Sequence, residues 1–414
     1  MESSHRNNLS INQTPNCAVQ DFTSQLPSGI LADIFTRLPI KAIVQCKCVR
    51  KTWCKLISDD HFSSNMYTEE TPFTHIALMD VSYLLSRVGS SYLLEFEGKV
   101  HECNNPSTLV SMKLKSPIEE LLPVGSSKGL FCLVEVSLHH DLFYINNPIL
   151  EQYVVLPKAK RCSYEETCTM GYGFGYSPST RHFKVIRIVT QLRVGFEALA
   201  KAEILTLGHD ETWRNLDVSS IQYYFGSCAI TLGGTLHWIV GKFVCTPDFK
   251  TITNISTDLI VGFDIDEERF RTILLPSALE NQKKQMRLTS VGNCLCLGDY
   301  NESIFQIDVW RMEDYGVSES WTKTCIISTT WLNEYSVSSA PPMIGISEDD
   351  QDTFLISDLN NHCLISYNLK NNSWSKLEVH GTVLYGDFYP FAYDPSFVSM
   401  KDVFRGSQLR ILQI

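Results

Sequence analysis

Residues 263–276 read FDIDEERFRTILLP, which predicts a short strand, a polar turn and a second strand that begins at the aromatic Phe270. The same unit recurs along the chain, each time with an aromatic residue at the corresponding place. These aromatic residues follow one another at intervals of 51 to 60 residues: Tyr153, Trp213, Phe270, Trp321 and Trp374. Around them, runs rich in β-branched and aromatic residues alternate with Gly, Asn, Asp and Pro. The pattern predicts an all-β domain over residues 72–405.

Two all-β architectures fit a repeat of this length. Kelch repeats recur every ~50 residues, and each forms one four-stranded blade of a β-propeller. Gly233-Gly234 matches the double glycine of such blades. We therefore expect a kelch-like β-propeller, with a pair of β-sandwiches as the second possibility. The blade count stays open, because Tyr176-Ser177-Pro178 and Phe183 form an additional half unit between Tyr153 and Trp213.

The N-terminal part of the chain has helical periodicity. Apolar residues recur at helical spacing within residues 21–66 and predict three short helices. Pro27 opens the first helix, and Pro39 ends it and begins the second. A third helix, beginning at Val49, places Val49 and Trp53 on one face. So small a unit does not bury all of its apolar surface, and we expect it to pack on a partner or on the neighbouring domain.

The composition argues against several classes of function. A formal net charge of −11 disfavours general nucleic-acid binding, which depends on Lys and Arg. Residues 1–20 are polar and predict a disordered arm, not a signal peptide. No apolar run approaches the ~20 residues of a membrane helix. The 14 cysteines are scattered, several of them inside apolar runs, as is typical of reduced thiols. We expect a soluble protein of the cytoplasm and/or nucleus, without a disulfide framework.

Several short motifs resemble reactive sites but lack the required context. Gly125–Gly129 has the spacing of a nucleophile elbow, yet a strand follows where a helix is needed. Gly171–Gly175 lacks the helix of a phosphate-binding loop, so we expect a β-bulge or tight strand packing there. We expect a surface loop at His139-His140-Asp141 and a solvated turn at Glu267-Glu268. The chain is predicted to have no catalytic residue, no metal and no cofactor.

Aromatic residues of the β domain are candidates for ligand contacts. The tryptophans are nevertheless expected to pack between blades because of their repeat-like spacing: Trp213, Trp238, Trp310, Trp321 and Trp374. Loops at one mouth of a propeller are where a substrate would bind. Trp331–Tyr335 and Tyr385–Tyr389 are aromatic-rich loop candidates, and the sequence does not select between them.

Residues 26–57 resemble a plant F-box. Their order and spacing match over some thirty residues, from Leu26-Pro27 to Trp53 and Leu56-Ile57. The resemblance implies docking on a Skp-family adaptor, and through it on a cullin. The residues that it implicates in adaptor binding are Leu26, Pro27, Ile30, Leu31, Ile34, Leu38, Pro39, Val49 and Trp53. Spacing alone does not tell which of them face the adaptor and which face the helices' own core.

The rest of the chain resembles the plant F-box-associated domain, whose family includes kelch-like and pollen S-locus F-box proteins. The matching pieces occur in family order, among them Gly173-Phe174-Gly175-Tyr176 and Gly234-Thr235-Leu236-His237-Trp238. The resemblance implies the non-catalytic substrate-recognition subunit of an SCF (Skp–cullin–F-box) ubiquitin ligase, which holds an unidentified target protein for ubiquitylation and degradation. The alternatives are a non-ligase interaction scaffold, a pollen S-locus-type protein that targets an RNase, and a propeller enzyme, for which no clustered catalytic groups are found.

Overall fold

A computed structural model of the 414-residue chain describes most of its residues. The described residues are 26–59, 62, 73–80, 91–97, 109–115, 117, 121–137, 140–160, 167–192, 199–218, 223–225, 229–245, 252–279, 285–329, 341–348, 351–358, 363–377, 379–380 and 388–413. The predicted arm, residues 1–20, lies outside them. Within these ranges, no helix has the length and apolar character needed to span a membrane.

Three short helices begin the described chain, as predicted. They are α1 (Ser28–Thr36), α2 (Ile40–Val49) and α3 (Lys51–Ile57). Pro27 and Pro39 occupy the N-cap positions of α1 and α2, where the missing N–H costs no helical hydrogen bond. Arg50 has an extended backbone (φ −150°, ψ 147°) and separates α2 from α3. The prediction that Val49 and Trp53 share one helix face is therefore wrong, because Val49 ends α2.

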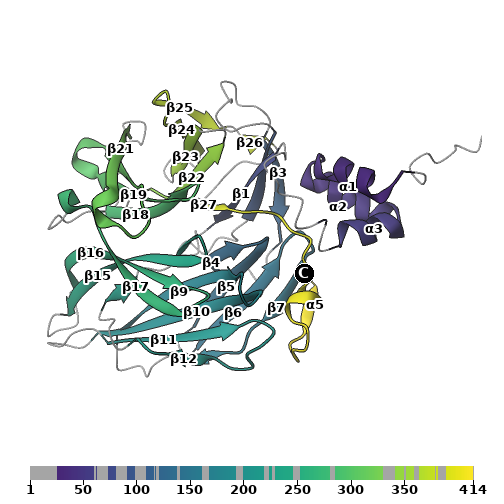
Figure 1. The fold of residues 1–414 in the computed structure, drawn as a ribbon, viewed down its shortest axis with the longest axis horizontal. Coiled ribbons are helices and arrows are strands. Elements are labelled where there is room, and N and C mark those ends of the chain that lie inside the picture. Colours follow the sequence, from purple (N-terminus) through teal and green to yellow (C-terminus); the bar gives the residue numbers. More distant parts are fainter. Residues whose placement is uncertain are drawn as a thin grey trace, which may run out of the picture.

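The strands form six sheets, which are the blades of a β-propeller (Figure 1), so the first of the two predicted architectures is confirmed. Blade I consists of β1 (Phe73–Asp80), β2 (Ser91–Glu97), β3 (Leu109–Leu114), β26 (Val379–His380) and β27 (Phe388–Ala392). Blade II consists of β4 (Leu122–Ser127), β5 (Leu130–Val136), β6 (His140–Asn147), β7 (Gln152–Val155), β8 (Ala159–Lys160) and β28 (Ile411–Gln413). Blade III consists of β9 (Thr167–Ser177), β10 (His182–Leu192), β11 (Leu199–Thr206) and β12 (Arg214–Leu216).

The remaining blades follow in chain order. Blade IV consists of β13 (Tyr224–Phe225), β14 (Ile230–Leu232), β15 (Thr235–Cys245), β16 (Ile252–Asp264) and β17 (Arg269–Leu274). Blade V consists of β18 (Gln285–Val291), β19 (Cys294–Asn301), β20 (Gln306–Met312) and β21 (Trp321–Ser328). Blade VI consists of β22 (Met343–Glu348), β23 (Gln351–Asp358), β24 (Cys363–Asn368) and β25 (Ser373–Leu377). Short helical turns complete the chain: η4 (Ser277–Leu279), η5 (Glu302–Ile304), η6 (Ser318–Ser320) and α5 (Met400–Val403).

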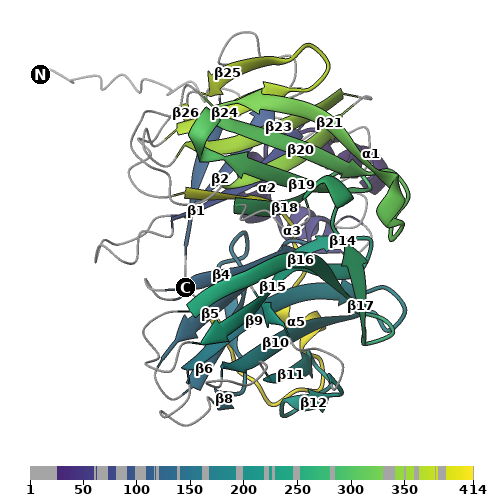
Figure 2. The same cartoon turned by 90° about the vertical axis from the view of Figure 1, so that its left-hand side faces the viewer.

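The blades form a closed ring. The innermost strands of neighbouring blades contact one another in the order β27, β4, β9, β14, β18, β22 and again β27. Figure 2 shows blades V and VI on one side of the ring and blades II and III on the other. The ring closes within blade I, where β27 from the C-terminal part of the chain pairs antiparallel with β1, in the register Leu78 to Pro390. N- and C-terminal segments thus share one sheet.

The predicted repeat corresponds to the fourth strand of each blade, counted from the centre of the ring. Its aromatic residue lies in β7, directly before β12, in β17, at the start of β21 and in β25: Tyr153, Trp213, Phe270, Trp321 and Trp374. The repeat therefore marks blades II to VI in the correct phase. Blade I has no complete unit in the sequence, because its strands come from two distant segments.

Tryptophan side chains form hydrogen bonds between neighbouring blades. The Nε1–H of Trp213 in blade III donates to the carbonyl of Pro157 beyond β7, at 2.8 Å. Trp321 in blade V likewise donates to the carbonyl of Leu274 in blade IV, at 2.9 Å. Packing between blades is confirmed for these residues. The prediction is wrong for Trp374, whose side chain is 51% exposed on the rim strand β25.

The glycines of β9 are explained by close strand packing, as expected. A Cβ atom on Gly171 would lie 2.6 Å from Phe225, and one on Gly173 would lie 2.7 Å from Leu236. Any larger residue would push blade IV away from blade III, so glycine is required by contact and not by phosphate binding.

Buried and partly buried ion pairs also join blade III to its neighbours. Asp141 lies in β6 and is fully buried, and its carboxylate accepts a hydrogen bond from Nε of Arg187 at 2.8 Å. The expectation of a surface loop is therefore wrong for Asp141, whereas His139 lies outside the described residues. Glu268 occupies the predicted turn between β16 and β17, yet it also accepts a hydrogen bond from Nζ of Lys184 at 2.9 Å.

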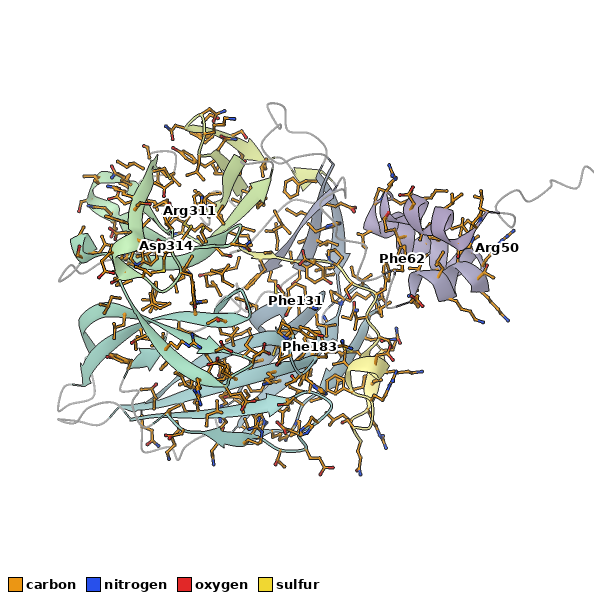
Figure 3. The ribbon with its side chains drawn as sticks, viewed as in Figure 1. Arg50, Phe62, Phe131, Phe183, Arg311 and Asp314 are labelled. Atoms are coloured by element: carbon orange, nitrogen blue, oxygen red, sulfur yellow. The ribbon has the colours of Figure 1, made fainter. Side chains whose placement is uncertain are left out.

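The helices pack directly on the ring, beside β3 in Figure 1. The backbone N–H of Ile40, at the start of α2, donates to Oε1 of buried Glu95 on β2 at 2.7 Å. His75 on β1 donates to the same oxygen at 3.0 Å. Phe62 lies between the helices and the propeller (Figure 3), with its ring 6.4 Å from that of Phe35. Helices and blades therefore share one hydrophobic core.

Closure by β27 yields the first prediction. We expect a chain that ends at residue 380 to aggregate, because β1 and the inner edges of blades II and VI lose their partner. A chain that ends at residue 410 lacks only the rim strand β28 and should stay soluble. Soluble yield and size-exclusion profile check both chains. A monomeric, folded chain 1–380 would contradict the closure argument.

The contact of Glu95 yields the second prediction. Glu95→Ala leaves the buried N–H of Ile40 without its acceptor, so we expect the free energy of unfolding to fall by about 2 kcal/mol. Glu267→Ala removes an exposed partner of Arg271 and should cost less than about 1 kcal/mol. Urea denaturation of the full chain compares the two. Equal losses for both variants would show that Glu95 has no special role in joining the helices to the ring.

Candidate functional site

An exposed apolar stripe lies on the first helix and the residue before its cap. Leu26, Ile30 and Ile34 follow the i, i+4, i+8 spacing of one helix face. Their side chains are 37%, 49% and 41% exposed, although they are large and hydrophobic. Val49 at the end of α2 is 59% exposed. Large apolar side chains aligned on one face are typical of a surface that binds a groove in a partner.

The residues predicted to bind an adaptor divide into two groups. Leu31, Leu38 and Trp53 pack towards the shared core of helices and blades. Trp53 lies edge-on to Phe35, with 5.2 Å between ring centroids. Pro39 caps α2 and is half-buried. The outward group consists of Leu26, Pro27, Ile30, Ile34 and Val49.

Sequence reasoning did not identify the residues that attach the helices to the ring. Phe35, Ile40, Ile43 and Ile57 are buried in the shared core. Phe35 is adjacent to Ile34, and about 100° around α1 separates the buried side chain from the exposed one. The signal that could have separated them was the position of each residue on the helical wheel relative to the stripe.

The short turns of the propeller gather at one end of its inner strands. Two examples are Lys128-Gly129 between β4 and β5 and Gly233-Gly234 between β14 and β15. Both glycines of the second turn have positive φ (56° and 77°), as two-residue hairpins require. The turn predicted within Gly125–Gly129 is confirmed for Lys128-Gly129, whereas residues 125–127 belong to β4. We call this end of the ring the tight-turn face.

The helices occupy the tight-turn face for a topological reason. Strand β27 ends at this face, and β1 begins there, because Ala392 pairs with Ile76 near the start of β1. The chain therefore enters the propeller from the helices at the same face at which it leaves β27. The ring of Phe397, beyond β27, accordingly receives the ammonium of Lys47 at 4.9 Å.

The second and fourth strands of the blades end at the opposite face, because antiparallel strands alternate in direction. Three such ends are Leu192 of β10, Cys245 of β15 and Ser328 of β21. The candidate loop Trp331–Tyr335 lies outside the described residues. Tyr389, from the other candidate loop, instead belongs to β27 and faces the centre of the ring.

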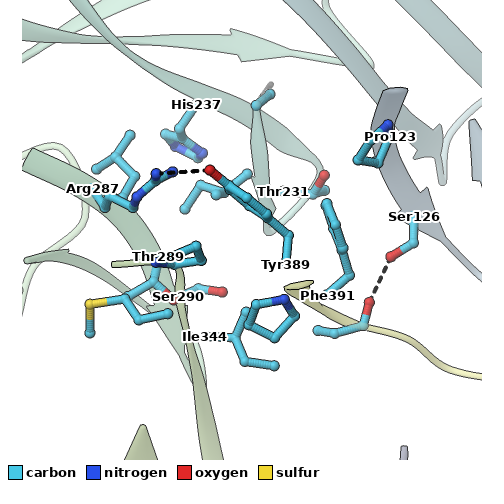
Figure 4. A pocket seen from close by; sticks show the side chains of 18 of the residues that line it. Pro123, Ser126, Thr231, His237, Arg287, Thr289, Ser290, Ile344, Tyr389 and Phe391 are labelled. Carbon is cyan, nitrogen blue, oxygen red and sulfur yellow. Dashed lines mark hydrogen bonds between the residues drawn. The ribbon is translucent and has the colours of Figure 1, made fainter. Parts of the chain in front are cut away.

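A cavity of about 850 Å³ occupies the centre of the ring (Figure 4). All six blades contribute to its wall, including Phe391, Tyr172, His237, Thr289 and Ile344. Trp238 also reaches this wall while its Nε1–H donates to the carbonyl of Tyr172 at 3.0 Å. Burial lowers the pKa of His237 to about 4, so its imidazole is neutral at physiological pH.

Metal binding has no support in the described part of the chain. No group of three or more His, Cys, Asp or Glu side chains there could hold an ion. Asp141 neutralises Arg187, and His140 lies beside it on β6.

Comparison with known proteins matches both parts of the chain. A family model described as "F-box associated beta propeller domain" matches residues 86–394, and one described as "F-box-like" matches residues 23–69. An F-box protein of Arabidopsis thaliana is 26% identical, over 91% of this chain and 87% of its own. F-box protein CPR1 of Arabidopsis thaliana is 28% identical over 86% and 84%. An F-box/kelch-repeat protein of the same plant is 23% identical over 75% and 81%.

Two adjacent residues of α1 test the division into outward and inward groups. Ile34→Ser changes an exposed side chain, so we expect the free energy of unfolding to change by less than about 0.5 kcal/mol. Phe35→Ala empties a site in the shared core and should cost about 3–5 kcal/mol. Urea denaturation followed by tryptophan fluorescence measures both. A large loss of stability for Ile34→Ser would place that residue in the core and remove it from the exposed apolar stripe.

Proposed function

The chain belongs to the family of plant F-box proteins with an F-box-associated β-propeller domain, and from this premise we propose that it is the substrate-recognition subunit of an SCF ubiquitin ligase. The F-box helices bind a Skp-type adaptor, and the propeller holds a target protein. The chain itself contributes position rather than chemistry. A target lysine held near the conjugating enzyme reacts at a raised effective concentration.

The observation that carries this proposal is the two-sided character of the helices. Phe35, Ile40 and Ile57 are buried against the propeller, whereas Ile30 and Ile34 remain exposed on the other side of α1. An isolated domain gains nothing from such a stripe, because exposed aliphatic surface costs free energy in water. A partner groove that covers the stripe removes this cost.

The same geometry favours the opposite face for the target. The helices cover part of the tight-turn face at blades I and II, where they share a hydrophobic core with Phe131 and Ile149. The longer connections between strands leave from the other face. A target bound there leaves the adaptor surface unobstructed, and the rigid core between Glu95 and Ile40 fixes its direction relative to the adaptor.

Adaptor binding is tested with Ile30→Ser combined with Ile34→Ser. We expect co-purification with a Skp-type adaptor to fall at least about tenfold, because two apolar anchors of the interface become polar. Leu274→Ser and Ile326→Ser, on exposed rim positions of blades IV and V, form the matched control. Undiminished adaptor binding by the α1 variant, at unchanged thermal stability, would reject the proposed docking surface.

Ligase function is tested separately from docking. Proximity labelling in plant cells, with the proteasome inhibited, compares the wild type with the same α1 double variant. Proteins labelled by both forms, but ubiquitylated only with the wild type, are the expected targets. Partners whose ubiquitylation and abundance do not depend on α1 would instead identify a non-ligase scaffold.

A further inference from the structure

The central cavity combines apolar walls with a cluster of hydrogen-bond donors on blades V and I. Arg287 and Thr289 lie two residues apart on β18, so their side chains point to the same face of the strand. Tyr389 faces them from β27 (Figure 4). Nη2 of Arg287 donates to the phenolic oxygen of Tyr389 at 3.4 Å, and the guanidinium lies 5.3 Å from the ring centroid. Blade VI separates blades V and I, so this contact reaches across the cavity and not along its wall.

Thr289 adds a donor that the protein leaves unused. Its side chain is buried, and its hydroxyl oxygen accepts a hydrogen bond from the backbone N–H of Gly345 at 3.2 Å. Within the described ranges, the hydroxyl proton has no acceptor. The phenolic oxygen of half-buried Tyr389 accepts from Arg287, and its proton has no acceptor within the described ranges either. A buried donor such as the hydroxyl of Thr289 is normally satisfied by a ligand or by water.

The arrangement around Thr289 is rigid. A Cβ atom on Gly345 would lie 2.1 Å from Cγ2 of Val291 and 2.4 Å from the carbonyl oxygen of Ser290, so glycine alone allows β22 to approach β18 this closely. The hydroxyl of Thr289 is thereby held in place before any ligand arrives, which lowers the cost of binding.

Apolar side chains form the rest of the wall near these donors. They come from five strands in four blades: Ile230, Ile239, Leu288, Ile344 and Phe391. A volume of about 850 Å³ falls within the ~300–1,000 Å³ range of small-molecule sites. The neighbouring His237 is neutral at physiological pH and brings no competing charge.

We propose that the central cavity binds a small organic acid, with its carboxylate at Arg287, Thr289 and Tyr389 and its apolar body against Leu288, Ile344 and Phe391. All three polar groups can donate, and one of them is cationic, so the complementary head group is an anionic acceptor. A guanidinium presents its N–H donors as a planar fork that matches the two oxygens of a carboxylate. The apolar walls require a body of hydrocarbon or aromatic character.

This site is independent of adaptor docking. It lies at the centre of the ring, whereas the stripe of Leu26, Ile30 and Ile34 lies on α1 at its edge. A small molecule that fills the cavity contacts strands of several blades at once. Its binding therefore stabilises the folded ring by mass action.

The test uses the full chain and two matched probes, 2-naphthoate and the uncharged 2-naphthamide, in titration calorimetry. We expect saturable binding of 2-naphthoate and at least about fivefold weaker binding of the amide, because only the acid carries the anionic head. Arg287→Met keeps an apolar stem and should weaken 2-naphthoate at least about tenfold. Arg405→Met, at an arginine that is exposed beside α5, is the matched control and should bind like the wild type.

A second variant tests the site even if the Arg287→Met chain does not fold. Tyr389→Phe keeps the ring and removes one donor, and it should weaken 2-naphthoate about threefold while leaving the amide unchanged. The proposal is overturned by the absence of saturable binding up to the solubility limit of the acid. Equal affinity for acid and amide, or undiminished affinity of a folded Arg287→Met chain, overturns it as well.

Discussion

The pairing of β27 with β1 is the constraint on which the rest of the structure depends. It joins Leu78 to Pro390 across more than three hundred residues and turns six sheets into a ring. Without it, β1 would lose its strand partner, and β4 of blade II and β22 of blade VI would lose the neighbour between them. The same strand contributes Tyr389 and Phe391 to the central cavity, and its continuation reaches Phe397 beneath the helices. Closure, cavity and helix attachment are therefore consequences of one strand.

The helices are part of this closed structure and not an appendage. Glu95 of blade I accepts the first N–H of α2, and aromatic contacts run from Trp53 through Phe35 to Phe62. Buried carboxylates that accept backbone and side-chain hydrogen bonds fix orientation as well as stability. The exposed apolar stripe of α1 consequently has a defined direction relative to the cavity and to both faces of the ring. A substrate receptor needs such a fixed geometry, because its contribution is the placement of a target.

Much of this architecture could be predicted from the sequence. Aromatic residues recur at the fourth strand of the blades and so marked five blades in phase, and two of them, Trp213 and Trp321, pack on the preceding blade. Blade I was missed because its strands come from both ends of the chain and leave no repeat. Trp374 and Asp141 were misjudged because spacing does not reveal exposure or a distant partner such as Arg187. The residues expected to bind an adaptor were predicted as one set, and their division into an outward and an inward group required the position of the ring. The donors of the cavity carry no local motif, since Arg287 and Tyr389 meet only after closure.

The position of β27 near the C-terminus also sets an order of events during synthesis. The F-box helices end at Ile57, whereas the ring closes only when residues 388–392 have been made. At roughly 5–20 residues per second, about 17 to 67 seconds separate the two events. During that interval the shared core of helices and blades lacks Tyr393 and Phe397, which belong to the same core as Phe35, Ile40 and Ile57 in the finished protein. The helices of a nascent chain therefore complete their inner face only when the last part of the propeller has been made.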